Sequence, residues 1–350
     1  MFEFGADLQR RSEMFGSFPA AGISRLSTPR ANRPTLTKFG LTLSSEEHPP
    51  EHLVAIAVAA ERAGFDFVSI SDHFHPWIGE QGHSPFVWTV LGAIAGQTTD
   101  IEVGVGVTCP TVRMHPAINA HAVATTACLF GDRFTWGVGT GEALNEHVLG
   151  DRWPPAPQRL EMLEEAIEVM RALWTGESIT HRGRYYTVED ARIFDLPDDP
   201  IPVLVSAFGE KSAQLAARAG DGLWITGIKD EVIDAYRAEG GSGDIWTQLS
   251  LCWDEDEDAA RERALRVWPN TGLPGQLAQD LRTVQHMEQA TSLVTDDHLE
   301  DMPMGPNPEP ILRSISEARE AGIEYIYLHQ IGDPTEGFIE FWEAEIRPEL

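Results

Sequence analysis

The stretch FVSISDHFHPWIGEQGHSPFVWTVLGAIAGQTTDIEVGVGV, residues 67–107, contains the pattern that decides the fold. It opens with a short apolar run, Phe67 to Ile70, continues through a helical pattern from about Pro85 to Gln97, and closes with a second apolar run, Ile101 to Val107. Runs that are apolar at consecutive positions suit strands that are covered on both faces, as in a parallel sheet. The stretch therefore predicts one strand–helix–strand unit of an α/β fold.

The same alternation continues on both sides of this stretch. Before it come a strand, Leu36 to Leu43, and an apolar-periodic helix, His52 to Ala63. After it, helices alternate with five more predicted strands: Phe134–Val138, Pro202–Ser206, Leu223–Thr226, Gln248–Trp253 and Tyr325–His329. About eight βα units predict a (β/α)8 TIM barrel. A doubly wound open sheet is the alternative, although it rarely contains so many units.

Three segments interrupt the alternation. Arg182 to Tyr186 predicts a small hairpin. The region from about 268 to 310, rich in Pro, Gly, Asp and Gln, predicts an insertion before the last strand, near the barrel mouth. We interpret residues 1–35 as a poorly ordered N-terminal extension or a misassigned start, and residues 36–350 as a single barrel domain.

The charge composition limits the possible partners. The 55 acidic residues outnumber 26 basic ones, and the formal net charge is −29. A surface of this sign repels phosphodiester backbones, so we expect no nucleic-acid partner. The acidity is either incidental or an adaptation to high salt, where screening weakens the repulsion between carboxylates. We favour the halophilic interpretation.

Localisation and metal content are inferred from what the sequence lacks. No run of about 18 apolar residues predicts a membrane span, and the first residues contain no apolar core of a secretory signal. The three cysteines, Cys109, Cys128 and Cys252, are scattered, which argues against both a disulfide framework and a zinc cluster. We therefore expect a cytoplasmic protein without a metal site.

Candidate functional residues gather where the predicted strands end, which is where barrel enzymes carry their active sites. Each has a purely structural alternative: Asp72 as a turn cap, His73 as an ordinary loop histidine, Trp77 as a packing anchor, and the glycines from Gly137 to Gly141 as a tight turn. Their coincidence at successive strand ends favours a site. The strand-end segments are Ser71–Trp77, Gly106–Thr111, Gly137–Glu146, Ser206–Ser212 and Thr226–Lys229.

Two of these residues suit hydride transfer. Histidine in general titrates near neutrality and can act as the base beside a substrate hydroxyl, and His73 is the candidate. A carboxyl group can act as the acid beside a ring nitrogen, and Glu142 is the candidate. The segment from Ser206 to Ala213 places small residues at a helix N-terminus, where free N–H groups attract phosphate, and Lys211 strengthens that interpretation.

Three motifs carry a family resemblance. Ser-Asp-His-Phe-x-Pro-Trp covers 71–77, Gly-His-x-Pro-Phe covers 82–86, and Gly-Val-Gly-Thr-Gly-Glu-Ala-Leu-Asn-Glu covers 137–146. With them the sequence resembles the luciferase-like monooxygenase superfamily, and within it the deazaflavin-dependent dehydrogenases related to the glucose-6-phosphate dehydrogenases of actinobacteria. The resemblance implies a barrel, a homodimer, and the 8-hydroxy-5-deazaflavin coenzyme F420.

The resemblance also implies roles for individual residues. His73 would be the base or oxyanion stabiliser and Glu142 the acid facing the ring. The Gly106–Val107 bond would be a non-proline cis peptide forming a bulge under the ring. Phe208 departs from the family's pattern, which has glycine there. The implied cofactor-binding residues are Asp72, Gly106, Val107, Cys109, Gly141, Asn145, Phe208, Gly209 and Lys211, and the implied substrate pocket contains Glu46, Trp77, Thr226 and Lys229.

The substrate is where the sequence departs most from the resemblance. Sugar-phosphate members of the group place three basic residues on the phosphate, and only Lys229 matches this pattern. Ala278 and Glu300 stand at the other two positions. The region between Gly272 and Gly305 contains one basic residue, Arg282. We therefore predict an F420-dependent oxidoreductase that passes hydride between the deazaflavin C5 and a small alcohol, carbonyl or enone, and not glucose 6-phosphate. The alternatives are an FMN-dependent monooxygenase and a barrel that binds a cofactor without catalysis.

Overall fold

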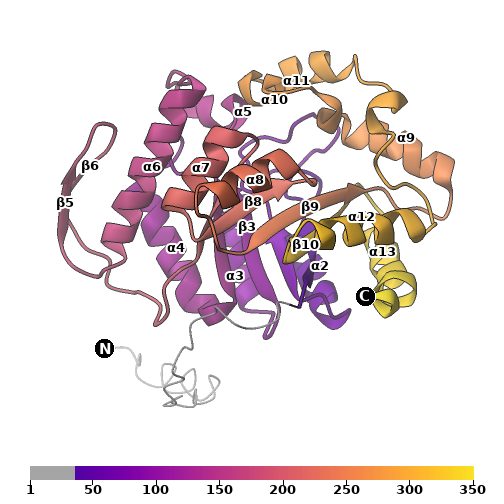
Figure 1. The fold of residues 1–350 in the computed structure, drawn as a ribbon, viewed down its shortest axis with the longest axis horizontal. Coiled ribbons are helices and arrows are strands. Elements are labelled where there is room, and N and C mark those ends of the chain that lie inside the picture. Colours follow the sequence, from indigo (N-terminus) through magenta and orange to yellow (C-terminus); the bar gives the residue numbers. More distant parts are fainter. Residues whose placement is uncertain (1–35) are drawn as a thin grey trace, which may run out of the picture. The chain divides into compact units, whose positions relative to one another are not determined.

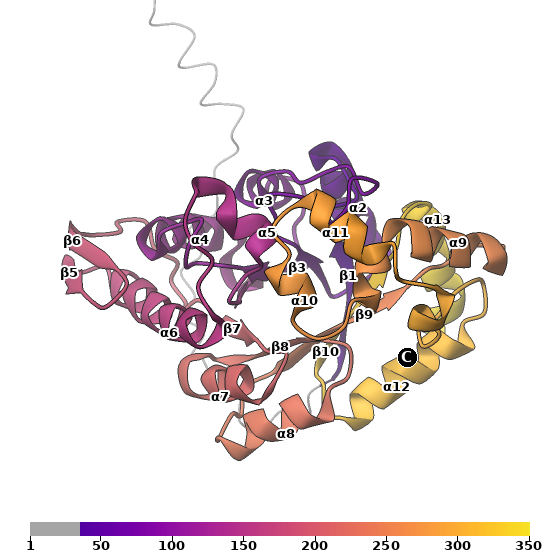
Figure 2. The same cartoon turned by 90° about the horizontal axis from the view of Figure 1, so that it is seen from above.

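A computed structural model describes residues 36–350, in which eight parallel strands form a closed barrel (Figures 1 and 2). Going round the barrel, each barrel strand pairs with the next barrel strand in the chain, so that β4 pairs with β7, and β1 pairs with β10 to close the ring. The strands are β1 (Lys38–Leu43), β2 (Phe67–Ile70), β3 (Glu102–Thr108), β4 (Phe134–Val138), β7 (Val203–Ser206), β8 (Gly222–Thr226), β9 (Ile245–Leu251) and β10 (Tyr325–Gln330).

The helices lie outside this ring, as Figure 2 shows. They cover it because their apolar faces pack on the outward side chains of the strands, which leaves the strands buried on both faces. The covering helices are α2 (Pro50–Arg62), α3 (Val87–Ala95), α4 (Pro116–Phe130), α6 (Ala156–Leu173), α7 (Glu210–Ala219), α8 (Asp230–Ala238), α12 (Glu309–Glu320) and α13 (Thr335–Phe341).

The barrel interior is divided into a filled part and an open part. Aromatic side chains from four strands fill the part away from the carboxyl ends of the strands, where the Trp224 and Trp246 rings stack with centroids 4.7 Å apart. β3 contributes glycine there, and a Cβ on Gly106 would lie 2.5 Å from the Trp224 ring. Thr226, two residues after Trp224 and on the same face of β8, is exposed. The barrel is therefore open to solvent at the carboxyl end of its strands.

The insertion lies at this open end. After α9 (Glu257–Val267) the chain forms two short helices, α10 (Leu277–Asp280) and α11 (Val284–Thr291), before α12 leads into the last strand. Figures 1 and 2 show α10 and α11 on the same side of the barrel as α5 (Ala143–Glu146), which follows the end of β4.

Most of the predicted elements are confirmed, and the closed ring shows that the open-sheet alternative is wrong. The predicted strand Gln248–Trp253 begins three residues earlier, because Ile245 and Trp246 are also buried strand residues. The predicted hairpin Arg182–Tyr186 is the turn between β5 (Ile179–Arg182) and β6 (Thr187–Ala191). The predicted N-terminal extension lies outside the described residues. Within the described residues, no helix has the length and apolar character needed to cross a membrane.

Candidate active site at the barrel mouth

His73 lies at the end of β2 and is held by Glu46 from the loop after β1. The Nδ1 atom of His73 is 3.2 Å from Oε1 of Glu46, and the two side chains are 10% and 3% exposed. The other carboxylate oxygen of Glu46 accepts hydrogen bonds from the Ser71 hydroxyl, at 2.7 Å, and from the Ser44 hydroxyl, at 3.1 Å. The two hydroxyl donors hold the Glu46 carboxyl in place, and its Oε1 orients the imidazole with Nδ1 toward itself.

Trp77 lies against the His73 ring and under the insertion. The two ring centroids are 4.9 Å apart in an edge-on arrangement. The backbone N–H of Trp77 donates to the side-chain oxygen of Gln81, and the Gln81 amide donates to the Val267 carbonyl at 3.0 Å. Trp77 also packs on an apolar cluster with Ala278 of α10. The wall of the site therefore includes residues of the insertion.

Glu142 is connected to the His73 loop through Asn145. The buried Asn145 side chain accepts the backbone N–H groups of Phe74, at 2.9 Å, and His75, at 3.1 Å. Its amide donates to Oε2 of Glu142 at 3.4 Å. Glu142 precedes the first turn of α5 without capping it, so its carboxyl is not used by the helix. The structure thus brings the ends of β2 and β4, with His73 and Glu142, to one place.

Asp72 belongs to a buried charge network that the sequence did not reveal. Its Oδ1 atom pairs with Arg113 at 2.9 Å, and Arg113 also reaches Oε1 of Glu146 at 3.5 Å. The backbone N–H of Arg113 donates to Glu146 at 2.7 Å. The Arg113 guanidinium thus lies between the carboxyls of Asp72 and Glu146. Burial raises the pKa of Glu146 to about 7. The Oδ2 atom of Asp72 is buried and accepts no hydrogen bond from any residue of 36–350.

The backbone between β3 and β4 has the form that the resemblance implied. The Gly106–Val107 peptide is cis, and the pairing of β3 with β4 shifts register between Val105 and Thr108. Gly141 has φ +74°, and a Cβ there would lie 2.6 Å from the sulfur of Cys109. Burial raises the pKa of the Cys109 thiol well above its usual value, so this thiol is a packing group.

The predicted phosphate-side residues lie at the starts of α7 and α8. The backbone N–H groups of Phe208 and Gly209 donate to the Ser212 hydroxyl at 3.2 and 3.3 Å. Phe208 is 53% exposed, and the Lys229 ammonium lies 4.9 Å from its ring centroid. Lys211 is exposed and forms no ion pair or hydrogen bond with another residue in the described part of the chain.

Of the three positions at which the resemblance implied a basic residue, Lys229 carries one, whereas Ala278 and Glu300 do not. Ala278 packs against the apolar cluster of Ile78, Leu144 and Met287, against which Trp77 also packs. Glu300 is an exposed carboxylate, and Arg282 is also exposed. Lys229 is the only predicted substrate-pocket residue with a positive charge.

A second buried histidine–glutamate pair at the mouth was not predicted. Nε2 of His329, on β10, is 2.9 Å from Oε1 of Glu47, and both side chains are almost fully buried. The other oxygen of Glu47 accepts the backbone N–H of Gly332 at 2.6 Å. The other ring nitrogen of His329 lies 3.3 Å from the Gln248 amide, which faces the barrel interior. This pair ties the loop after β1 to the loop after β10.

Comparison with known proteins identifies the family. The luciferase-like monooxygenase family model matches residues 34–325. The chain belongs to this family. Among curated members, it is 35% identical over 328 residues to the F420-dependent glucose-6-phosphate dehydrogenase of Segniliparus rotundus, covering 89% of this chain and 98% of the relative. It is 33% identical to the enzyme of the same name from Tsukamurella paurometabola, with the same coverage.

Solved structures of other proteins share the barrel. An F420-dependent secondary alcohol dehydrogenase in complex with an F420–acetone adduct superposes with a TM-score of 0.82 at 28% identity, covering 89% of this chain and 98% of the other. The coenzyme F420-dependent tetrahydromethanopterin reductase of Methanopyrus kandleri superposes with a TM-score of 0.71, covering 90% of this chain and 99% of the other. Because the identity is 21%, this likeness supports the fold alone. The predicted family and barrel are confirmed.

Proposed function

We propose that this protein is an F420-dependent oxidoreductase that interconverts a small alcohol and its carbonyl compound. The observation that carries the proposal is the Glu46–His73 pair, placed at the barrel mouth and linked through Asn145 to the carboxyl of Glu142. A base and an acid in one place are the two proton-handling groups that hydride transfer to or from an alcohol requires.

The residues at the mouth fit a deazaflavin. The buried Oδ2 of Asp72 lacks a donor in the described chain, and an N–H or O–H of a bound ring would supply one. Asn145, Gly106, Val107, Cys109 and Gly141 would border the ring, while Gly209, Phe208 and Lys211 would lie at the phosphate end. The coenzyme F420 would supply a ring carbon, C5, that accepts or donates hydride and does not activate oxygen.

His73 is the proposed base. Glu46 occupies its Nδ1, which leaves Nε2 for the hydroxyl of a substrate. In the oxidative direction Nε2 would accept the hydroxyl proton, and the carboxylate of Glu46 would stabilise the resulting imidazolium. In the reductive direction the imidazolium would return that proton to the carbonyl oxygen. Glu46 is thus a positioning residue that acts through His73.

Glu142 is the proposed acid on the cofactor side. Its carboxyl does not cap the helix, and in the described part of the chain its donor is the Asn145 amide, at the long distance of 3.4 Å. It can therefore exchange a proton without breaking the fold around it. Asn145 fixes the distance between Glu142 and the His73 loop, because its side chain contacts both.

The surroundings favour a small neutral substrate over a sugar phosphate. Trp77 and Ala278 make the wall apolar, and Lys229 is the single cation expected there. Two missing charged hydrogen bonds would weaken phosphate binding by about 3–6 kcal/mol, at about 1.5–3 kcal/mol each. The structural likeness to an F420-dependent secondary alcohol dehydrogenase supports this choice, whereas the curated relatives, at 33–35% identity, are glucose-6-phosphate dehydrogenases and define the competing substrate.

The test is a comparison of substrates on one preparation. Purified protein is mixed with oxidised F420, and the loss of its visible absorbance is followed with secondary alcohols and with glucose 6-phosphate. We expect turnover with an alcohol, and we expect His73→Ala and Glu142→Gln to bind F420 yet lose about 10²–10⁴-fold in kcat. The matched controls are His121→Ala and Glu317→Gln, at two exposed positions.

Two outcomes would contradict the proposal. Turnover with glucose 6-phosphate alone would contradict the proposed substrate class, and tight stoichiometric binding of FMN in place of F420 would contradict the proposed cofactor.

We also propose that the protein is a cytoplasmic homodimer adapted to high salt. The support is the family expectation of a dimer and the net charge of −29. Because salt screens repulsion between surface carboxylates, molar salt should raise the melting temperature. Light scattering at low and high salt measures the mass, and a monomer under both conditions would exclude the dimer.

A further inference from the structure

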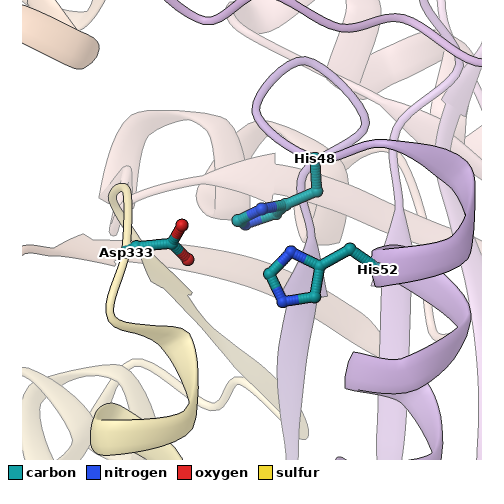
Figure 3. A group of neighbouring side chains, drawn as sticks. All are labelled: His48, His52 and Asp333. Carbon is teal, nitrogen blue, oxygen red and sulfur yellow. The ribbon is translucent and has the colours of Figure 1, made fainter.

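Three potential metal ligands converge at the seam where the barrel closes. His48 precedes α2, His52 lies in the first turn of that helix, and Asp333 lies in the loop between β10 and α13. One ligand atom from each can be chosen so that all lie within 4.8 Å of one another. Figure 3 shows the three side chains pointing toward a common centre from two segments at opposite ends of the barrel sequence.

These side chains have few competing partners. His48 is 4% exposed, yet its ring forms no hydrogen bond with any residue that the structure describes; its ring contact is with His52, at 4.8 Å between centroids. Within residues 36–350, the polar contact of the His52 ring is with Oε1 of Glu336, at 4.0 Å. The carboxylate of Asp333 accepts the Thr335 hydroxyl at 3.4 Å. The ring nitrogens of His48 are therefore free, among the described residues, to bind an ion.

We propose that His48, His52 and Asp333 bind a divalent transition-metal ion of the Zn²⁺ class. Two imidazoles and a carboxylate suit Zn²⁺, whereas Mg²⁺ and Ca²⁺ prefer oxygen ligands alone. With bonds of about 2.0–2.1 Å, tetrahedral ligand atoms lie about 3.3 Å apart, so the side chains need to close by about 1.5 Å. Asp333 is exposed and His52 half-buried, so both have the freedom to move. Glu336 or water would complete the shell.

The ion would act as a clamp on loops that also contact the active site. Glu47, next to His48, accepts the backbone N–H of Gly332, next to Asp333, and pairs with His329. A metal bound by His48, His52 and Asp333 would hold the same two loops together a second time. Its role is therefore structural, stabilising the closure between β1 and β10. It takes no part in the proposed hydride transfer.

The sequence did not predict this site. The spacing of His48 and His52 alone is compatible with two ordinary surface histidines, and the third ligand follows more than 280 residues later. The expectation of no metal came from the scattered cysteines, which are indeed not part of this cluster. Only the closure of the barrel brings Asp333 to the histidines.

The experiment uses the full chain without a histidine tag, freed of metal with a chelator. Titration calorimetry with Zn²⁺ should show one site per chain, and Zn²⁺ should raise the melting temperature. Co²⁺ should give the intense visible bands of a tetrahedral site. His52→Ala and Asp333→Asn, both changes outside the core, should each weaken Zn²⁺ binding by about 10²-fold or more, since loss of even an outer-shell partner costs about 10–100-fold. His121→Ala, an exposed histidine on α4, should change nothing.

Two results would overturn the proposal. One is Zn²⁺ affinity in His52→Ala and Asp333→Asn equal to that of the unmodified chain, which would place any bound metal elsewhere. The other is the absence of a Zn²⁺-dependent change in heat and melting temperature. Both readouts are independent of F420, so they stand or fall separately from the proposed oxidoreductase activity.

Discussion

Replacing Glu146 by Gln should change how the stability of the protein depends on pH. Glu146 is 1% exposed and shares Arg113 with Asp72, and burial raises its pKa to about 7 from an ordinary value of 4.5. Between these two values the folded protein keeps the proton on Glu146 while the unfolded chain has lost it. The free energy of unfolding therefore falls as the pH rises through this window.

The magnitude follows from the two pKa values. A difference of about 2.5 corresponds to about 3.4 kcal/mol at about 1.36 kcal/mol per pKa unit, and about 2.5 kcal/mol of it falls between pH 5 and pH 8. Glutamine is neutral at every pH and resembles the protonated acid. Relative to the unmodified chain, Glu146→Gln should thus gain about 2.5 kcal/mol of stability on going from pH 5 to pH 8.

The assay is urea unfolding of both proteins at pH 5 and pH 8. Each comparison is made between variant and parent at one pH, so contributions of all other titrating groups cancel. Glu317→Gln, an exposed glutamate on α12, is the control and should show no pH-dependent difference. A change below about 1 kcal/mol for Glu146→Gln would refute the reasoning, because it would mean that Arg113 keeps both carboxyls ionised.

Three further substitutions test the packing of the site. Tyr327→Phe removes the acceptor of the buried Trp224 N–H, now at 2.7 Å, and should lower the unfolding free energy by about 1–3 kcal/mol in urea. Gly141→Ala would place a Cβ 2.6 Å from the Cys109 sulfur on a backbone with φ +74°, so it should lower the free energy of unfolding by about 1–3 kcal/mol. Adding Cys109→Ala should restore only the part of this loss that comes from the contact with sulfur, because the strained φ remains. Asn145→Ala leaves two loop N–H groups without an acceptor, so kcat should fall while circular dichroism stays native; unchanged kcat would count against its positioning role.

The fold was accessible from the sequence because parallel strands are buried on both faces. Runs such as Phe67–Ile70 and Phe134–Val138 are almost wholly apolar or small, and each is bounded by a helix pattern. Once the strands were placed, reading the residues at their ends found His73 and Glu142. The linking role of Asn145 was not accessible, since a hydrogen bond from one loop to another leaves no periodic signal.

Arg113 and His329 are functional-site residues that the sequence patterns did not predict. Arg113 lies five residues beyond β3, in a loop, and nothing in its neighbours predicts burial between two carboxyls. His329 is different, because it lies in the last predicted strand, Tyr325–His329, and examining that strand end as the earlier ones were examined would have singled it out. Its partner Glu47, adjacent to Glu46, could be assigned only after the barrel had closed.

The pairing of Lys38 with Tyr325, the first rung between β1 and β10, has a consequence for biosynthesis. As the chain emerges from the ribosome, one edge of β1 stays without its neighbour until nearly the whole polypeptide has been made. Unpaired strand edges invite association with other chains, so the nascent protein is most vulnerable to aggregation during this interval. A product truncated before Tyr325 would lack β10 and would be a sheet with two open edges, at β1 and at β9.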